Sequence, residues 1–255
     1  MVGKEQDYSV DVKGLEKYYG SIHALKKISF KVERSTIYCL VGPNGAGKTT
    51  TFRILATLIL PTSGDAYVEG HSVVREPEAV RRVISYLPEE VGAYRNITGL
   101  EYLEIVAKIY YRGRGFEEVV ERGIKISGLS EKDLRRPMKQ YSKGMKRRIQ
   151  VARALMILPR VAILDELTAG LDPVQKVELR SIIRGYSKSH GITVLLSTHE
   201  MAEAEDLCER VAIIDRGSIV AEGYVEEIIK AVGAKNLEDA FVRLVSGGEN
   251  AKGSG

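Results

Sequence analysis

The sequence predicts an α/β fold in which a mainly parallel sheet is covered by helices on both faces. Short apolar segments are separated by helical patterns, as expected for parallel strands joined by helical crossovers. Apolar and polar residues alternate in two segments near the start, which predicts an antiparallel layer. From residue 98 to about residue 158 the apolar spacing is helical, which predicts a helical insertion in the core. The apolar segments are 37–41, 161–164 and 193–196, and the alternating ones are 8–12 and 28–32.

The composition is that of a soluble globular protein. Of 255 residues, 44% are hydrophobic and 28% are charged. The formal charge of +4 is small, so no nucleic-acid partner is expected. No apolar run is long enough to cross a bilayer, and the first residues lack a signal-peptide pattern. Cys39 and Cys208 lie far apart in apolar segments, which favours buried thiols over a disulfide or a metal site.

The segment from Leu15 to Gly20 lies between the two alternating strands and is predicted to be a loop. It contains Tyr18 and Tyr19. A tyrosine in such a loop either covers an edge of the core or offers an aromatic face on which an adenine ring can stack. This segment alone leaves both possibilities open.

A glycine-rich segment follows the first apolar strand directly and precedes a predicted helix over 51–58. Strand, G-x-x-x-x-G-K-T and helix together predict a phosphate-binding P-loop rather than a simple turn. The glycines allow successive N–H groups to point at an anion, and the helix adds the positive end of its dipole. Lys48 supplies a charge for the outer phosphates, and the Thr49 hydroxyl is a ligand for Mg²⁺. The predicted ATP-binding residues here are Gly42, Pro43, Asn44, Gly45, Ala46, Gly47, Lys48, Thr49 and Thr50.

The elements after this helix alternate between strands and helices. We expect a turn at 60–65, a strand at 66–69, a helix at 77–82 and a strand at 83–87. Thr98 and Glu101 form a capping box that begins the helical insertion. A helix over 174–188 joins the last two apolar strands. Ligands of parallel sheets sit beyond the carboxyl ends of the strands, where the P-loop, Glu89, Asp165, Glu166 and His199 all fall.

Two carboxylates, Asp165 and Glu166, follow the strand at 161–164. Beside a P-loop, Asp165 is placed to hold Mg²⁺ and Glu166 to orient or deprotonate the attacking water. The alternative is an ordinary charged strand end. With a P-loop in the same chain, we favour the catalytic interpretation.

Polar residues after the strand at 193–196 allow two interpretations. Ser197 and Glu200 have the spacing of a capping box, so Ser197 is expected to cap a helix. His199 then lies near a helix N-terminus, where it can hydrogen-bond a γ-phosphate.

The segment 141–148 precedes a long helical pattern. Ser142 is a predicted N-cap, whereas Arg147 and its basic neighbours are expected to form a solvated face.

With these segments in this order, residues 8 to 225 resemble the nucleotide-binding domain of ABC ATPases. Residues 42–50 look like Walker A, 161–166 like Walker B, 141–145 like the signature segment and 169–172 like the D-loop. His199 matches the switch histidine and Tyr19 the aromatic residue that stacks on adenine. The resemblance implies a P-loop NTPase (RecA-like) core with an antiparallel β subdomain and an inserted helical subdomain.

The resemblance also implies that each ATP is bound by residues of two subunits. Lys48, Glu166 and His199 are expected to be catalytic in ATP hydrolysis. ATP and Mg²⁺ are the expected cofactors, and Thr49, Asp165 and Glu89 the expected metal ligands. The second subunit, either another copy or a similar ABC subunit, is expected to contact ATP in trans through Ser142, Lys143, Gly144, Met145 and Asp172.

Three positions depart from the common family pattern. The signature segment reads Tyr-Ser-Lys-Gly-Met, Glu89 replaces the Q-loop glutamine, and Leu167 replaces the proline after Walker B. The first two, with Leu237 to Phe241, resemble the ATP-binding subunits of ABC-2-type exporters, including drug, haem and sodium efflux systems. This implies a separate transmembrane permease and a cytoplasmic chain peripheral on the membrane's cytoplasmic face, with residues 89–102 toward the permease.

Two other functions agree with part of the pattern. One is a soluble ABC ATPase of the iron–sulfur assembly type, and the other is a nucleotide-gated regulator without turnover. For the domains, we predict an ABC ATPase domain over 8–230. The core comprises 8–87 and 156–230 and the helical insertion 88–155. A helical extension is expected at 231–245 and a disordered tail at 246–255.

Overall fold

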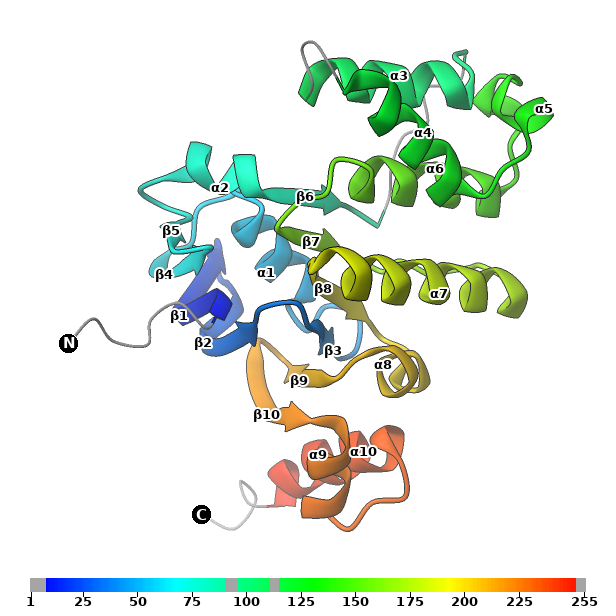
Figure 1. The fold of residues 1–255 in the computed structure, drawn as a ribbon. Coiled ribbons are helices and arrows are strands. Elements are labelled where there is room, and N and C mark those ends of the chain that lie inside the picture. Colours follow the sequence, from blue (N-terminus) through cyan, green and yellow to red (C-terminus); the bar gives the residue numbers. More distant parts are fainter. Residues whose placement is uncertain (1–7, 90–95, 111–114, 251–255) are drawn as a thin grey trace.

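The computed structural model describes residues 8–89, 96–110 and 115–250, without the side chains of 247–250 (Figure 1). It contains two sheets with helices around them, which confirms the predicted α/β fold class. The strands are β1 Tyr8–Tyr19, β2 Ile22–Glu33, β3 Ile37–Val41, β4 Ser63–Val68, β5 His71–Ser72, β6 Ile84–Leu87, β7 Val161–Leu164, β8 Thr193–Thr198, β9 Arg210–Asp215 and β10 Ser218–Tyr224. The helices are α1 Lys48–Leu55, α2 Pro77–Val83, α3 Gly99–Tyr110, α4 Phe116–Ser127, α5 Glu131–Leu134, the 3₁₀ helix Met138–Gln140, α6 Lys143–Leu155, α7 Pro173–His190, α8 Met201–Leu207, α9 Val225–Ala231 and α10 Leu237–Asn250.

The larger sheet has the strand order β10-β9-β3-β8-β7-β6, and all its pairs are parallel except β9 with β10. Both faces of β3 are buried, which explains why its sequence is continuously apolar. Ile37, Cys39 and Val41 pack into the core on one face, with residues of α6, α7 and α8. Tyr38 and Leu40 pack into the second core, with α1 and the smaller sheet.

The smaller sheet is antiparallel, in the order β2-β1-β4-β5. It forms the predicted N-terminal layer, but its strands are longer than expected. The predicted loop from Leu15 to Gly20 was wrong, because β1 continues through Tyr19 and pairs with β2 up to the hairpin turn. Register shifts interrupt the pairing after Val12, and they hide the alternation in the sequence.

Helices α3 to α6 gather on one side of the larger sheet, away from the smaller one (Figure 1). They lie within the segment predicted as the helical insertion. The capping box forms as predicted, since Thr98 Oγ1 accepts the Glu101 N–H and the Glu101 carboxylate accepts the Thr98 N–H. The predicted domain boundaries themselves remain predictions.

The two cysteines form a disulfide, so the prediction of free thiols was wrong. Cys39 lies in β3 and Cys208 follows α8, and both are buried. Because β3 pairs in parallel with β9, Cys39 lies opposite Val211, three residues after Cys208. Chain pairing therefore brings the two Cα atoms to 5.9 Å, although the residues are 169 positions apart.

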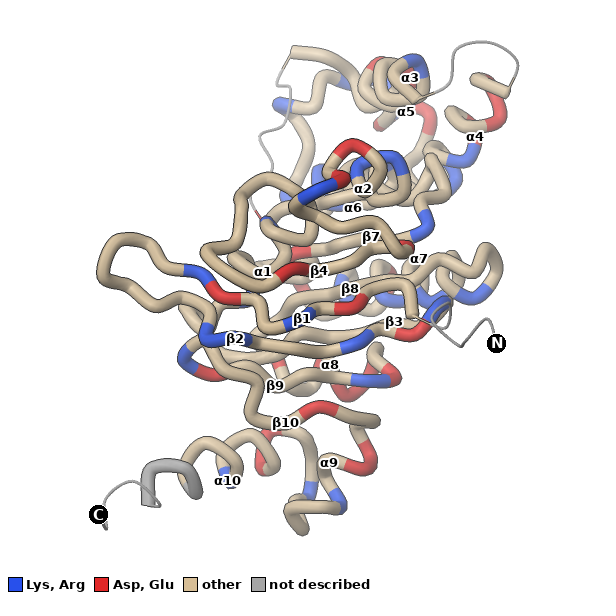
Figure 2. Tube along the Cα trace, turned by 90° about the vertical axis from the view of Figure 1, so that its left-hand side faces the viewer, with Lys and Arg blue, Asp and Glu red and all other residues tan. Residues whose placement is uncertain are grey.

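Helices α9 and α10 form the end of the molecule opposite the insertion (Figure 1). Leu237 and Ala240 of α10 are fully buried. The helix runs to Asn250, so it covers the first half of the segment predicted as a disordered tail, and 251–255 lie outside the described residues. Basic and acidic residues are interspersed along most elements (Figure 2). Among the described helices, none combines the length and apolarity needed to cross a bilayer.

Candidate active site

The P-loop, residues 42–50, connects β3 to α1 and encloses a pocket of about 250 Å³. Gly47 is the N-cap of α1 with φ of 112°, a conformation that favours glycine. A Cβ on Gly42 would lie 2.1 Å from the Ile214 carbonyl oxygen, so β9 leaves no room for a side chain there. The pocket is lined by Ala24, Asn44, Gly45, Gly47, Lys48, Thr49, Thr50, Glu89 and Glu166.

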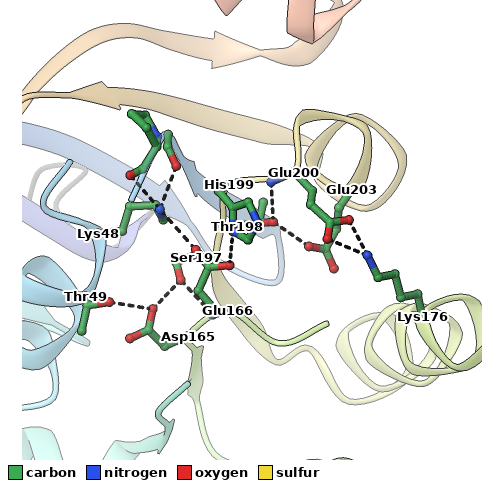
Figure 3. A network of polar contacts seen from close by, with 12 residues as sticks. Lys48, Thr49, Asp165, Glu166, Lys176, Ser197, Thr198, His199, Glu200 and Glu203 are labelled. Atoms are coloured by element: carbon green, nitrogen blue, oxygen red, sulfur yellow. Dashed lines mark hydrogen bonds and ion pairs between the residues drawn. The ribbon is translucent and has the colours of Figure 1, made fainter. Parts of the chain in front are cut away.

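Lys48 is buried at the start of α1 and points into the network of Figure 3. Its Nζ donates to the carbonyl oxygens of Gly42 at 2.7 Å and Pro43 at 3.1 Å. It also forms an ion pair with Glu166 Oε1 at 3.2 Å. The ammonium group is thus held at the mouth of the loop, where a phosphate chain would meet it.

Asp165 directly follows β7, and Thr49 of the P-loop contacts its carboxylate. Its Oδ1 accepts hydrogen bonds from Ser197 Oγ and from Thr49 Oγ1, the latter at 3.3 Å. Its Oδ2 is buried and has no hydrogen-bond partner among the described residues. An unpaired buried carboxylate oxygen is costly in a protein interior, and Mg²⁺ prefers oxygen ligands of this kind. The donor set of Asp165 and Thr49 therefore fits Mg²⁺.

The Glu166 carboxylate lies between two cationic or proton-donating groups. Oε1 faces Lys48, and Oε2 is 2.8 Å from His199 Nδ1 (Figure 3). The histidine follows β8, and its side chain is 42% exposed. The backbone of Glu166 has φ of 45°, a left-handed conformation that is rare for a residue with a side chain. The adjacent strands thus bring Lys48, Asp165, Glu166 and His199 together as predicted.

Ser197 does not cap a helix, which corrects the prediction from its spacing to Glu200. It is the penultimate residue of β8 and is completely buried. Its Oγ donates to Asp165 Oδ1 and accepts the Glu166 N–H at 3.0 Å. Ser197 therefore fixes both carboxylate residues, a role that its local sequence pattern did not reveal.

Tyr86 in β6 is a second neighbour of Asp165 that the sequence did not point to. Burial and the negative charge of Asp165 raise the pKa of its hydroxyl to about 12. The phenol therefore stays neutral beside the carboxylate at physiological pH.

Arg147 does not lie on a solvated basic face, so that prediction was wrong. The side chain leaves α6 and is buried against the ends of β6 and β7. Its guanidinium donates to five backbone carbonyl oxygens, those of Pro88, Glu89, Asp165, Glu166 and Leu167. Burial lowers the pKa of Arg147, and nearby carboxylates, Asp165 foremost, oppose that shift. Its neighbour Arg148 pairs with Glu178 at the surface.

The remaining predicted residues do not line this pocket. Tyr19 is 43% exposed at the end of β1, with the Lys17 ammonium 5.1 Å from the centre of its ring. Ser142 caps α6 as predicted by accepting the Met145 N–H, and Asp172 caps α7. Lys143, Gly144 and Met145 occupy the first turn of α6, where Gln175 packs against Gly144. Within one chain, these residues contribute nothing to the P-loop pocket.

The sequence pattern that defines ABC transporters matches residues 25–169, more than half of the chain, including the P-loop, Asp165 and Glu166. This chain belongs to the ABC transporter family.

Relatives and solved structures agree with this assignment. The daunorubicin/doxorubicin resistance ATP-binding protein DrrA of Streptomyces peucetius is 37% identical over 90% of this chain and 69% of its own length. The bacitracin transport ATP-binding protein BcrA of Bacillus licheniformis is 38% identical over 82% of this chain and 67% of its own. The structure of an ATP-binding subunit of an ABC transporter superposes with a TM-score of 0.82 at 30% identity, covering 92% of this chain and 99% of that one. A dimeric ATP-binding cassette bound to ADP and Pi, MJ0796, gives 0.77 at 25% identity, covering 84% and 98%.

These findings confirm the predicted family, the P-loop NTPase fold and the enzyme class. The chain is an ATP-binding and ATP-hydrolysing subunit of an ABC transporter.

Proposed function

We propose that two ATP-binding subunits, either two copies of this chain or one copy and a similar ABC subunit, close around two ATP molecules to drive a separate membrane-spanning permease. The main support for this proposal is that Lys48, Asp165, Glu166 and His199 lie in one network of contacts beside the P-loop, whose pocket Lys48 and Glu166 line. The dimeric arrangement of the related cassette MJ0796 supports the pairing.

Each pocket residue has a distinct task in hydrolysis. The P-loop amides and Lys48 bind the phosphates, and Thr49 and Asp165 hold Mg²⁺, with Glu89 as a further oxygen ligand at the pocket wall. When bound, the metal neutralises charge on the β- and γ-phosphates. Glu166 accepts a proton from the attacking water. His199 contacts the Glu166 carboxylate through Nδ1, and the rest of its half-exposed ring is assigned to the γ-phosphate.

The signature segment completes the site of the other subunit. Ser142 is exposed at the N-terminus of α6, where backbone N–H groups and the helix dipole attract an anion. Lys143, Gly144 and Met145 of the same helix turn, with Asp172, are assigned to the same contact in trans, for which the Gln175 side chain that packs against Gly144 has to move aside. Tyr19 stacks on the adenine ring. Because each ATP then needs ligands from both subunits, binding closes the dimer and hydrolysis releases it.

The permease contacts the helical insertion. Ile105 and Ile109 of α3 are 45% and 68% exposed, which is an apolar surface suited to a protein partner. It adjoins the segment 89–102 expected to face the permease, of which 90–95 lie outside the described residues. The chain would then sit peripherally on the cytoplasmic face of the membrane. The resistance and transport roles named for DrrA and BcrA favour export over iron–sulfur assembly.

The substitution Glu166→Gln tests both the role of Glu166 as general base and the ATP-induced formation of a dimer. We expect this variant to bind ATP with Mg²⁺, to lose steady-state turnover by about 100-fold or more, and to elute as a dimer in gel filtration. Glu200→Gln is the matched control, because Glu200 lies beside the site but pairs with Lys176. It should keep turnover. Normal turnover of Glu166→Gln would exclude Glu166 as the base.

Copurification tests the membrane partner. A polytopic membrane protein recovered with the tagged chain supports the transporter role. Recovery of soluble scaffold proteins instead would point to iron–sulfur assembly.

A further inference from the structure

Arg147 binds two chain segments that both belong to the active site. Its Nε donates to the Leu167 carbonyl at 2.6 Å, and its Nη2 donates to the carbonyls of Asp165 at 3.0 Å and Glu166 at 2.7 Å. On the other side, Nη1 donates to the carbonyls of Pro88 and Glu89, both at 3.2 Å. One buried side chain thus joins the end of β7 to the end of β6.

The number of N–H groups on the arginine side chain matches the number of carbonyl oxygens around it. The guanidinium has five N–H groups in a rigid planar fork, and here it meets five carbonyl oxygens. Carbonyl groups are acceptors that must be satisfied when buried, and an unpaired buried charge is costly. The contacts therefore define one position for the segment 165–167 relative to α6.

The segment that Arg147 binds carries the strained residue. Glu166 has φ of 45°, so its backbone needs support from its surroundings. Ser197 holds the Glu166 N–H, and Arg147 holds the Glu166 carbonyl on the other side of the same residue. The carboxylate of this residue points toward Lys48 and His199.

We propose that Arg147 is a positioning residue for ATP hydrolysis, which aims the Glu166 carboxylate through the backbone of 165–167 and couples it to Pro88–Glu89 and the helical insertion. The proposal rests on the proposed role of Glu166 as base. It gives the insertion a direct connection to the catalytic turn, because Arg147 belongs to α6 and α6 packs against α3 and α4.

Substitution of Arg147 should therefore affect turnover rather than ATP binding. Arg147→Met should lower kcat by about 30-fold or more, while KM and the affinity for a fluorescent ATP analogue change by less than about threefold. Arg147→Lys keeps the charge but not the fork, and should lose about tenfold in kcat. Arg153→Met is the control, because Arg153 is on the same helix and, among the residues that the structure describes, donates to a single carbonyl, that of Tyr86. Its kcat should stay within about threefold of the native value.

A double-mutant cycle decides whether Arg147 acts through Glu166. In the Glu166→Gln background, single-turnover hydrolysis should fall by less than about threefold on adding Arg147→Met, because the carboxylate that it aims is already gone. An equal loss in both backgrounds, or an unchanged kcat, would overturn the proposal. If thermal melting shows that Arg147→Met does not fold, Arg147→Lys takes its place in the same cycle. Normal turnover of the single variant Glu166→Gln would instead show that Glu166 is not the base. The experiment therefore distinguishes failure of the proposed role of Glu166 from failure of the proposed role of Arg147.

Discussion

Ser197→Ala should be costly for stability, because the hydroxyl makes two buried hydrogen bonds at once. Without the hydroxyl, the Asp165 carboxylate loses a charge-assisted hydrogen bond, and such a bond contributes about 1.5–3 kcal/mol to stability. The substitution also leaves the Glu166 N–H buried without an acceptor, at a cost of about 1–3 kcal/mol. The free energy of unfolding should therefore fall by about 2.5–6 kcal/mol, well above the cost of about 1 kcal/mol expected for a lost helix cap.

Guanidinium-induced unfolding of the native protein and the variant measures this difference. Ser187→Ala is the matched control, since Ser187 is also buried but makes one bond to a neutral carbonyl, that of Ile192. Its cost should be about 0.5–1.5 kcal/mol. If Ser197→Ala destabilises the protein no more than Ser187→Ala, the serine does not support the acidic residues, and our account of the site is wrong.

Two further substitutions test other parts of the structure. Ser142→Asp and Ser142→Asn both preserve the cap of α6, but only the aspartate places a negative charge where a partner's γ-phosphate is expected. In the Glu166→Gln background, Ser142→Asp should abolish the ATP-induced dimer in gel filtration and Ser142→Asn should retain it, and equal dimerisation would argue against contact in trans. Glu203→Gln tests a buried acid: burial raises the pKa of Glu203 above 4.5, against the opposing hydrogen bond from Thr198. The folded state then binds the proton more tightly than the unfolded state, so the native protein loses stability as pH rises from about 4.5 through the folded pKa. The stability of Glu203→Gln relative to the native protein should therefore be greater at about pH 8 than at about pH 5 in denaturant titrations, and a pH-independent difference would contradict the sign of this shift.

The parts of the site that follow their strands directly were predictable from the sequence. The P-loop, Asp165 and His199 each follow a buried strand, and the parallel topology brings the ends of such strands together. Ser142 and Thr98 were predictable too, because a helix cap is a local pattern.

Residues that act over long sequence separations were missed. Arg147 binds carbonyls 18 to 59 positions away, and its hydrogen bonds leave no trace in local periodicity. For Ser197, the local spacing pointed to a cap, but the strand extends through Thr198 and buries the hydroxyl beside Asp165. The disulfide was missed for a similar reason, since only the pairing of β3 with β9 brings its cysteines together.

Three neighbouring strands of the larger sheet determine how well this enzyme tolerates sequence changes in its core. The P-loop, His199 and Asp165 follow β3, β8 and β7, which are neighbours in that order. Their mutual spacing is therefore set by the ladder of main-chain hydrogen bonds, about 4.8 Å per strand, and not by the side chains beneath. Core substitutions that conserve volume should therefore leave the distances between the Lys48 ammonium, the His199 imidazole and the Asp165 carboxylate unchanged. The dimensions of the catalytic centre are in this sense a property of the polypeptide backbone.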